Sequence, residues 1–429
     1  MEKRRSRLRR SLRASALDGT LSAMMVGFGE IYFAPLALFL GASPFQVGLL
    51  ATVPMLLGST FQLVATRLAH HFGDKHWVVA SAAIQAGVCL AAAVLAWTQW
   101  EGYVALLALV CVYWMLNLGI GPAWNAWMAR MVPASMRSRY LARRNMPIQL
   151  FLFLAIAIGG SILQFSERIT QGPALGFLTC FAIAGVARAG SAHFLSRQHD
   201  PGKGLKRQQP SLRAAAAGFR SQPYGRLILL IIFVVGSVNL SAPYFTPYWL
   251  KSLRLSYAQF TALTAMSFIA RVVASPYWGE IARNYGNRRG LQVAMVLVIP
   301  LSAMWSLSDN FVYMLGLQML AGFAWAGFDL CHILNLFDCT DDRNRAQVLS
   351  LFNLMNGAAI VVGSLLGGWL IKWTGDSGYH YLFLLSALGR LSAVLIFGPG
   401  AGAKRAGEHP FSAVFVRVIT LRGAVLRQP

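Results

Sequence analysis

Charged residues are scarce in this sequence. Asp, Glu, Lys and Arg together make up 12% of its 429 residues, whereas 56% are hydrophobic. A soluble globular domain has about 25% charged residues, because charged side chains must cover its surface. The composition therefore excludes a soluble globular protein. The mean hydropathy of +0.53 indicates that most of the chain lies in a membrane.

Elements typical of other membrane protein classes are also absent. The phosphate-cradling pattern Gly-x-x-x-x-Gly-Lys-Ser/Thr does not occur, which excludes a self-contained ATP-driven pump. The five cysteines fall in or beside apolar runs without the spacing of metal ligands. We therefore expect no disulfide, no metal site and no cofactor. No polar stretch is long enough to form an extramembrane catalytic domain, so we do not expect an enzyme.

About twelve apolar stretches follow one another along the chain. Each is close to the roughly 20 residues that a membrane-spanning helix needs. The sequence thus predicts an all-α membrane protein. The expected spans are 14–40, 45–69, 77–98, 103–128, 146–166, 173–196, 226–250, 257–282, 290–307, 311–337, 346–371 and 379–398. The connections at 41–44 and 99–102 are so short that the spans they join must run antiparallel.

The net charge of +23 comes from 38 basic and only 15 acidic residues. The basic residues gather in the N-terminal segment, in a polar linker near 197–225, in the C-terminal tail and in alternate connections between spans. This asymmetry is the positive-inside rule. We therefore expect these parts on the cytoplasmic side of the inner membrane, next to anionic lipid headgroups, and no nucleic-acid partner. The first apolar stretch carries Asp18 and Glu30 and lacks an obvious cleavage site, so we expect an uncleaved first span.

The second half of the sequence repeats features of the first half in the same order. Matched pairs lie about 200 to 213 residues apart; they include Tyr32 and Tyr244, Ser43 and Ser256, Gln46 and Gln259, and Arg188 and Arg390. Because six spans separate equivalent positions, both halves face the same way. The sequence predicts two six-helix bundles, at 14–196 and 226–398. The linker 197–225 joins them, and a basic segment (1–13) and a tail (399–429) flank them.

The loops after the second and eighth spans also correspond. They resemble the signature Gly-x-x-x-Asp-Arg-x-Gly-Arg-Arg of the major facilitator superfamily through Gly279, Gly286, Arg288 and Arg289, and more weakly through Gly73 and Lys75. Arg283 and Asn284 stand where the family has Asp-Arg. The stretch PAWNAW from Pro122 is similar to a bacterial branch of the superfamily. The resemblance implies a transporter whose solute site lies between two bundles near the membrane midplane. It also implies that these loops take part in a cytoplasmic latch between the halves.

Ionisable residues inside spans need an explanation, because a charge at mid-bilayer costs about 2.5–3.5 kcal/mol on insertion scales. Glu30 lies in the first span, which the resemblance places at the solute cavity. It is either a proton carrier or a structural carboxyl. Arg271 in the eighth span needs an anion, which is either a protein carboxylate or the solute itself, so it is also a candidate for the solute cavity. The resemblance makes Asp329 in the tenth span its natural protein partner. His332 shares a helical face with Asp329 and is either part of a proton relay or an ordinary buried histidine.

Further polar and aromatic residues fall inside the spans. Arg188 and Arg390 occupy equivalent outer helices, and we expect them to be structural or to face lipid. Neutral candidates for lining a solute cavity are Trp114, Asn117, Asn125, Asn239 and Asn356. Packing against neighbouring helices is the alternative for the tryptophan. The tail from Phe411 is either a helix on the membrane surface or disordered.

These features predict a secondary active transporter that moves a small solute by alternating access. We expect a monomer, with a proton as the coupling ion, because Glu30 and Asp329 can bind protons. One alternative is a transporter-like sensor or scaffold that binds a ligand without turnover. Another is a membrane-embedded transferase with His332 as base, which lacks a second clustered acid or base.

Overall fold

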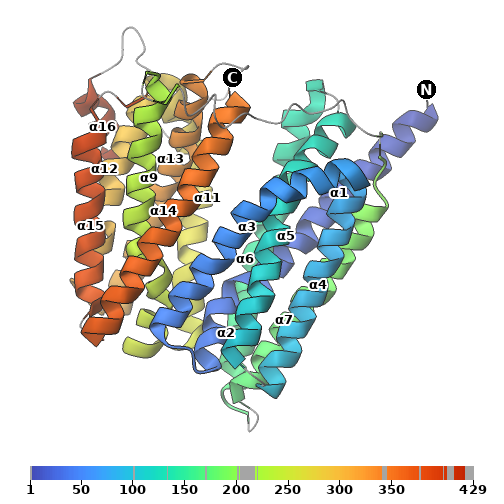
Figure 1. Ribbon diagram of the computed structural model, residues 1–429, viewed down its shortest axis with the longest axis horizontal. Helices are drawn as coiled ribbons and strands as arrows, with labels where there is room; N and C mark the ends of the chain where they lie inside the picture. Colours follow the sequence, from blue (N-terminus) through green and yellow to red (C-terminus); the bar gives the residue numbers. More distant parts are fainter. Residues whose placement is uncertain are drawn as a thin grey trace. The chain divides into compact units, whose positions relative to one another are not determined.

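The computed structural model describes residues 2–99, 102–132, 134–169, 172–200, 202, 218–219, 221–340, 345–375, 378–399, 401–402 and 410–420 (Figure 1). Within these ranges the chain consists of helices and short connections, without a strand, so the all-α prediction is confirmed. The chain divides into two compact units. Unit 1 comprises Met1–Gln208 and Thr246–Thr261, and unit 2 comprises Gln209–Phe245 and Ala262–Pro429.

Unit 1 contains the first six spans. Its helices are α1 (Glu2–Phe28), η1 (Glu30–Tyr32), α2 (Phe33–Phe39), α3 (Pro44–Phe72), α4 (Asp74–Thr98), α5 (Gly102–Met131), α6 (Ala134–Ser166) and α7 (Gly172–Ser196). α1 packs against α6 and α7, α4 against α5 and α7, and α3 against α5 (Figure 1). α1 begins well before the expected start at residue 14, because residues 2–13 contain no glycine or proline that would interrupt a helix.

The second half of the chain has the same succession of helices. They are α9 (Pro223–Ser241), η2 (Ala242–Tyr244), α10 (Phe245–Pro247), η3 (Tyr248–Ser252), α11 (Tyr257–Tyr285), α12 (Asn287–Met304), α13 (Phe311–Asp338), α14 (Arg345–Thr374), α15 (Gly378–Phe397) and α16 (Phe411–Thr420). In unit 2, α9 packs against α14 and α15, and α12 against α13 and α15. These pairs are the counterparts of the packed pairs in unit 1, which confirms the two pseudo-symmetric bundles.

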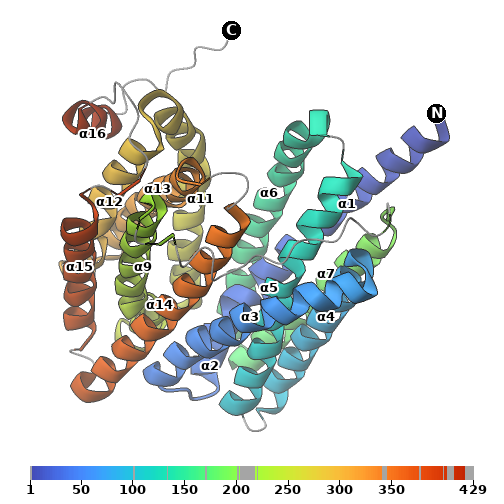
Figure 2. The ribbon, with the colours of Figure 1, turned by 45° about the horizontal axis from the view of Figure 1, so that its top comes forward.

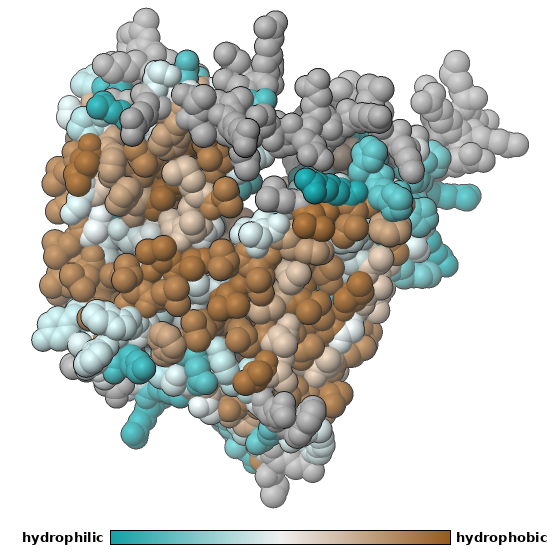
Figure 3. All heavy atoms as spheres, in the orientation of Figure 1, coloured by the Kyte–Doolittle hydropathy of each residue, from teal (hydrophilic) through white to brown (hydrophobic). Residues whose placement is uncertain are grey.

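Eleven helices among the described residues are long and apolar enough to cross a membrane. At the remaining expected span, 290–307, α12 begins with Asn287, Arg288 and Arg289, and these polar residues lower its apolar content. Its contacts with α13 and α15 are nevertheless those that α4 makes with α5 and α7. In Figure 3, hydrophobic side chains cover the middle of the helices in both units, and hydrophilic residues gather toward the helix ends.

The predicted repeat is visible in local contacts as well. Ser43 and Gln46 form a capping box at the start of α3, and Ser256 and Gln259 form another at the start of α11. The hydroxyl of Tyr32 donates to the carbonyl of Ile156 at 2.8 Å, and that of Tyr244 donates to the carbonyl of Ser364 at 2.5 Å. In each half, this bond ties the end of the first span to the fifth.

Two sequence expectations fall wholly or partly outside the described residues. Most of the predicted linker 197–225 lies outside them, as do residues 421–429 of the tail. Residues 411–420 form the helix α16, which packs against α12 (Figure 2). Val414 and Val418 of this helix are buried.

Candidate functional site

The first candidate site of unit 1 lies where the first span is interrupted. α1 ends at Phe28, and a single turn of 3-10 helix, starting at Glu30, precedes α2. The side chain of Glu30 is half-buried, and its Oε2 accepts a hydrogen bond of 2.6 Å from the hydroxyl of Tyr113 on α5. Tyr113 is itself fully buried. Glu30 thus lies inside the bundle, held by a neutral donor.

Tyr113 connects Glu30 to a series of buried polar groups. Its backbone carbonyl accepts a hydrogen bond of 3.2 Å from Nε2 of Gln85 on α4. Oε1 of Gln85 accepts from two nitrogens of Arg188 on α7, at 2.9 and 2.5 Å. Arg188 also donates to the hydroxyls of Ser22 and Ser191, each at 3.0 Å. Every nitrogen of this buried guanidinium is therefore bonded.

The series ends at a second carboxyl group on α1. The hydroxyl of Ser191 donates to Oδ1 of Asp18 at 2.7 Å, and Arg144 on α6 forms an ion pair of 3.3 Å with Oδ2. Nε of Arg144 donates to the carbonyl of Ser15, and its guanidinium lies 4.6 Å from the ring centroid of Trp124. We call Glu30, Tyr113, Gln85, Arg188, Ser191, Asp18 and Arg144 the buried polar chain.

Arg188 and Arg390 do not face lipid, so that part of the prediction was wrong. Their exposed fractions are 4% and 3%. Arg390 donates to the carbonyl of Val298 at 2.8 Å and to the hydroxyl of Ser386 at 3.0 Å. Both arginines join the last helix of their bundle to the third, which agrees with the structural role that was the other expectation.

Unit 2 contains the predicted pair of Arg271 and Asp329. NH1 of Arg271 on α11 lies 2.8 Å from Oδ2 of Asp329 on α13. The helices approach closely beside the pair, because a Cβ on Gly322 would meet the carbonyl of Ser267 and the side chain of Ala270. The side chains are 42% and 46% exposed. The pair is therefore open on one side.

His332 lies one turn beyond Asp329. Its Nδ1 is 2.8 Å from the carbonyl of Phe328 in its own helix, and its ring packs on the rings of Phe328 and Phe352, at 5.2 and 6.0 Å. Asp329 and His332 interact electrostatically but share no hydrogen bond among the described residues. The structure therefore places His332 beside the ion pair, in an aromatic setting.

The neutral cavity candidates do not form one group. Trp114, half-buried, lies edge-to-face on Tyr113 at 5.9 Å; Asn117 is half-buried and Asn125 is exposed, all on α5 of unit 1. In unit 2, Asn239 donates to the carbonyl of Val235 in its own helix, and Asn356 on α14 is half-buried. The ring contact of Trp114 is with the preceding residue of its own helix, so it does not decide between a cavity role and packing against a neighbouring helix.

The loop signature has a clear conformational basis. Gly73 and Gly286 have φ values of 91° and 86°, which favour glycine, and each separates two long helices. After Gly73, Asp74 forms an ion pair of 2.6 Å with Arg130 at the end of α5. After Gly286, Asn287 donates to Asp338 at the end of α13, at 2.7 Å. In the first half, the acidic residue of this contact is at the loop, and in the second half it is at the end of the neighbouring helix.

The other signature residues make contacts within their own units. Nε of Arg288 donates to the carbonyl of Ala401 at 3.0 Å, and NH1 of Arg289 donates to Gln292 at 2.8 Å. Lys75 is half-buried at the start of α4. A Cβ on Gly279 would meet no atom within 4 Å, so close packing does not explain this glycine.

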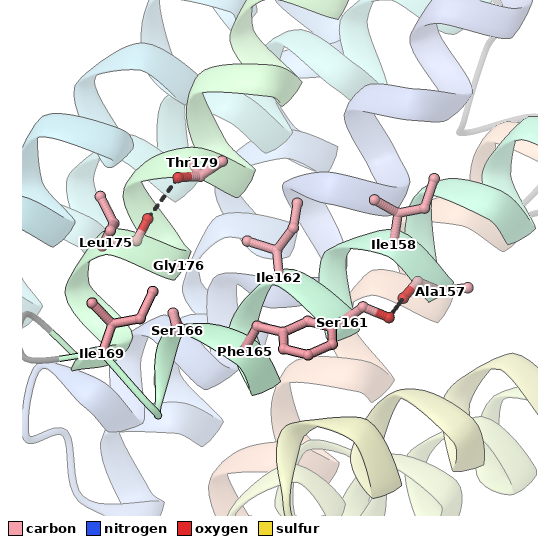
Figure 4. A pocket seen from close by; sticks show the side chains of 10 residues that line it. All are labelled: Ala157, Ile158, Ser161, Ile162, Phe165, Ser166, Ile169, Leu175, Gly176 and Thr179. Atoms are coloured by element: carbon pink, nitrogen blue, oxygen red, sulfur yellow. Dashed lines mark hydrogen bonds between the residues drawn. The ribbon is translucent and has the colours of Figure 1, made fainter.

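A surface pocket of about 430 Å³ lies between α6 and α7 (Figure 4). Its lining includes Ile158, Ile162, Phe165 and Leu175, and the hydroxyls of Ser161 and Thr179 are bonded within their own helices. None of the predicted site residues lines it. An apolar pocket of this kind lacks the groups that would bind a polar solute. Among the described residues, no cluster of His, Cys, Asp and Glu could hold a metal ion.

Solved structures of transporters share this fold. A bacterial homologue of the iron transporter ferroportin aligns with a TM-score of 0.72 at 16% identity, over 92% of this chain and 99% of that one. The nucleoside transporter NupG aligns with a TM-score of 0.69 at 13% identity, over 92% and 99%. A D-xylose-proton symporter aligns with a TM-score of 0.63 at 12% identity, over 95% and 98%. At these identities the likeness shows the fold alone.

Sequence relatives match shorter segments. The uncharacterized MFS-type transporter YfiU of Bacillus subtilis is 25% identical over 114 residues, which are 27% of this chain and 22% of that protein. Solute carrier family 67 member A1 of Homo sapiens is 26% identical over 195 residues, which are 43% of this chain and 45% of that protein. The chain thus spans less than half the length of these relatives.

The family itself is established by a match along almost the whole chain. The sequence profile of the Major Facilitator Superfamily matches residues 19–261 and again residues 227–429. The second match begins where the second half of the repeat begins, and the two matches overlap over residues 227–261. Together with the paired bundles, they show that this chain belongs to the major facilitator superfamily of transporters.

Proposed function

We propose that this protein is a proton-coupled secondary transporter that moves a small solute by alternating access, with Glu30 as the proton carrier. The observation that carries the proposal is the position of Glu30 at the interruption of the first span. Its carboxyl group accepts from the hydroxyl of Tyr113 and is joined through the buried polar chain to Arg188 and Asp18.

The charges of the buried polar chain support a change of protonation at Glu30. The chain contains two carboxyl groups, Glu30 and Asp18, and two guanidinium groups, Arg188 and Arg144. It is neutral with both carboxyls ionised and carries one positive charge once Glu30 is protonated. Opposite charges nearby favour a carboxylate, whereas apolar surroundings favour the neutral acid. Glu30 is bonded to the neutral hydroxyl of Tyr113, and Arg188 is joined to it only through Tyr113 and Gln85. A carboxyl group held in this way can take up and release a proton in each cycle.

Arg271 and Asp329 support a path for a polar solute in unit 2. Both lie inside apolar spans, and both side chains are more than two-fifths exposed. Charged side chains within a membrane almost always face a protein interior or a water-filled cavity, because exposure to hydrocarbon is costly. We therefore assign the open side of this pair to the solute pathway.

The distribution of basic residues supports an orientation with both termini in the cytoplasm and a location in the inner membrane. The D-xylose-proton symporter among the structural relatives adds general support, because its name states that this fold accommodates proton coupling. The solute of that protein is not carried over.

The test is solute-driven proton movement. Purified full-length protein is reconstituted into liposomes that contain a pH-sensitive dye, and a solute found by a thermal-shift screen is added outside without a gradient. We expect the wild type to move protons with the solute. Glu30→Gln should lose proton movement and keep solute exchange. Glu167→Gln, the same change at an exposed position, serves as the control.

Two outcomes would contradict the proposal. Proton movement in Glu30→Gln at the wild-type rate would remove Glu30 from the coupling step. Tight binding of the solute without any flux by the wild type would indicate the transporter-like sensor instead.

A further inference from the structure

The pair of Arg271 and Asp329 differs from the other ion pairs of the described residues. Its side chains are 42% and 46% exposed, against 26% and 20% for Arg130 and Asp74. The third pair, Arg144 with Asp18, is 14% and 5% exposed. The two more buried pairs join helices within unit 1. The exposed pair is therefore the one that a solute can reach.

The contact within this pair uses few of its polar atoms. NH1 of Arg271 meets Oδ2 of Asp329 at 2.8 Å, and neither side chain has another hydrogen-bond partner among the described residues. A guanidinium group has five N–H donors and a carboxylate has two acceptor oxygens. Donors of Arg271 and Oδ1 of Asp329 thus remain for a ligand.

The charges of the pair restrict the ligands that suit it. A ligand with only an anionic group would pair with Arg271 and repel Asp329. A ligand with only a cationic group would pair with Asp329 and repel Arg271. Either ligand would give the site a net charge, which is strongly unfavourable away from water. A ligand with both groups can pair with both residues at once, and the net charge of the site stays at zero.

We propose that Arg271 and Asp329 bind a zwitterionic solute, with its carboxylate on Arg271 and its ammonium group on Asp329. The proposal rests on the proposed transport function and names the chemical class of the solute. Aromatic side chains lie along the same helix: Phe328 and His332 pack on each other, and Trp325 lies edge-to-face on Phe328 at 5.3 Å. Trp325 and His332 are half-buried and favour a solute with an apolar or aromatic side group.

Binding is tested on the full-length protein in detergent with two matched sets of probes. The first set is phenylalanine, phenylpropanoate and phenethylamine; the second is alanine, propanoate and propylamine. Within each set the carbon skeleton is similar, and the zwitterion, the anion and the cation are compared. We expect at least one zwitterion to raise the melting temperature with a saturating concentration dependence, and its matched anion and cation to have no such effect.

Variants show whether the pair is responsible. Arg271→Ala and Asp329→Ala should each abolish the shift caused by the zwitterion. The exchanged variant, Arg271→Asp with Asp329→Arg, keeps both charges and should retain a shift. If the exchanged variant does not fold, the comparison of the zwitterion with its matched anion and cation on the wild-type protein still tests the proposal.

Several results would overturn the inference. One is an equal shift by the matched anion, which Arg271→Ala alone abolishes; this would make the site an anion site. An equal shift by the cation, or no shift by either zwitterion, would also refute it. Failure here is separate from failure of the proposed function. Proton-driven flux of another solute would leave the transport function intact, and a zwitterion shift without an effect of Glu30→Gln would leave this binding site intact.

Discussion

Gln85→Leu is the change that tests the buried polar chain most severely. Gln85 has no exposed surface, and it accepts two hydrogen bonds from Arg188, whose exposed fraction is 4%. Leucine has a similar volume but no acceptor. The substitution thus leaves two nitrogens of a buried guanidinium without partners, and it also removes the bond from Gln85 to the carbonyl of Tyr113.

The expected loss follows from the number and kind of these bonds. Bonds to charged groups contribute about 1.5–3 kcal/mol each in soluble proteins, whereas bonds between membrane helices average about 0.6 and reach about 1.7 kcal/mol. Because both bonds are made to one buried cation, we assign each of them a contribution of about 1.7 kcal/mol, the upper value for membrane helices. We therefore expect Gln85→Leu to lower the free energy of unfolding by about 3 kcal/mol.

The assay is reversible unfolding in mixed micelles with an increasing share of denaturing detergent. Arg188→Met combined with Gln85→Leu is the matched control, because it removes the unpaired cation together with its acceptor. The double variant should be more stable than Gln85→Leu alone. A loss below about 0.5 kcal/mol for Gln85→Leu, within the usual effect of a surface substitution, would refute the role given to this contact.

Three further predictions concern other parts of the chain. Arg271→Ala with Asp329→Ala should give a higher yield of folded protein than the worse of the two single variants, as measured by size-exclusion chromatography; an equal or lower yield would show that the two are not partners. An impermeant thiol reagent added outside cells should label a cysteine at Ser308 and not one at Gln208, which lies outside the described residues; the reverse pattern would invert the orientation. Gly73→Ala should lower the free energy of unfolding by about 1–2 kcal/mol, because alanine is strained at a φ of 91°, and an unchanged value in the same micelle assay would contradict this reading.

Local features of this fold could be predicted from the sequence. The capping residues Ser43 and Ser256 each precede a long apolar run, and the loop glycines Gly73 and Gly286 each separate two such runs. Signals of this kind depend on neighbouring residues alone. The pairing of Arg271 with Asp329 could also be anticipated, although only through the resemblance, because the two residues are 58 positions apart.

Contacts across helices could not be predicted in the same way. Apolar content predicts that Arg188 lies in a span. Because that helix is apolar on most sides, its sequence does not show whether the arginine faces the bundle or the lipid. Glu30 and Tyr113 are 83 residues apart, and Arg144 and Asp18 are 126 apart, so only the packing of the helices brings them together. Asp74 was missed although it directly follows the loop glycine, because the family signature directs attention to an earlier acidic position.

Accumulation of solute driven by a pH gradient tests the central claim most directly. Liposomes containing the wild-type protein are given an imposed pH gradient, and the internal concentration of a solute that stabilises the protein is followed over time. We predict accumulation above the external concentration for one direction of the gradient, with collapse to equilibrium when a protonophore is added. Equilibration to the external concentration that is the same with and without the gradient would contradict proton-coupled transport.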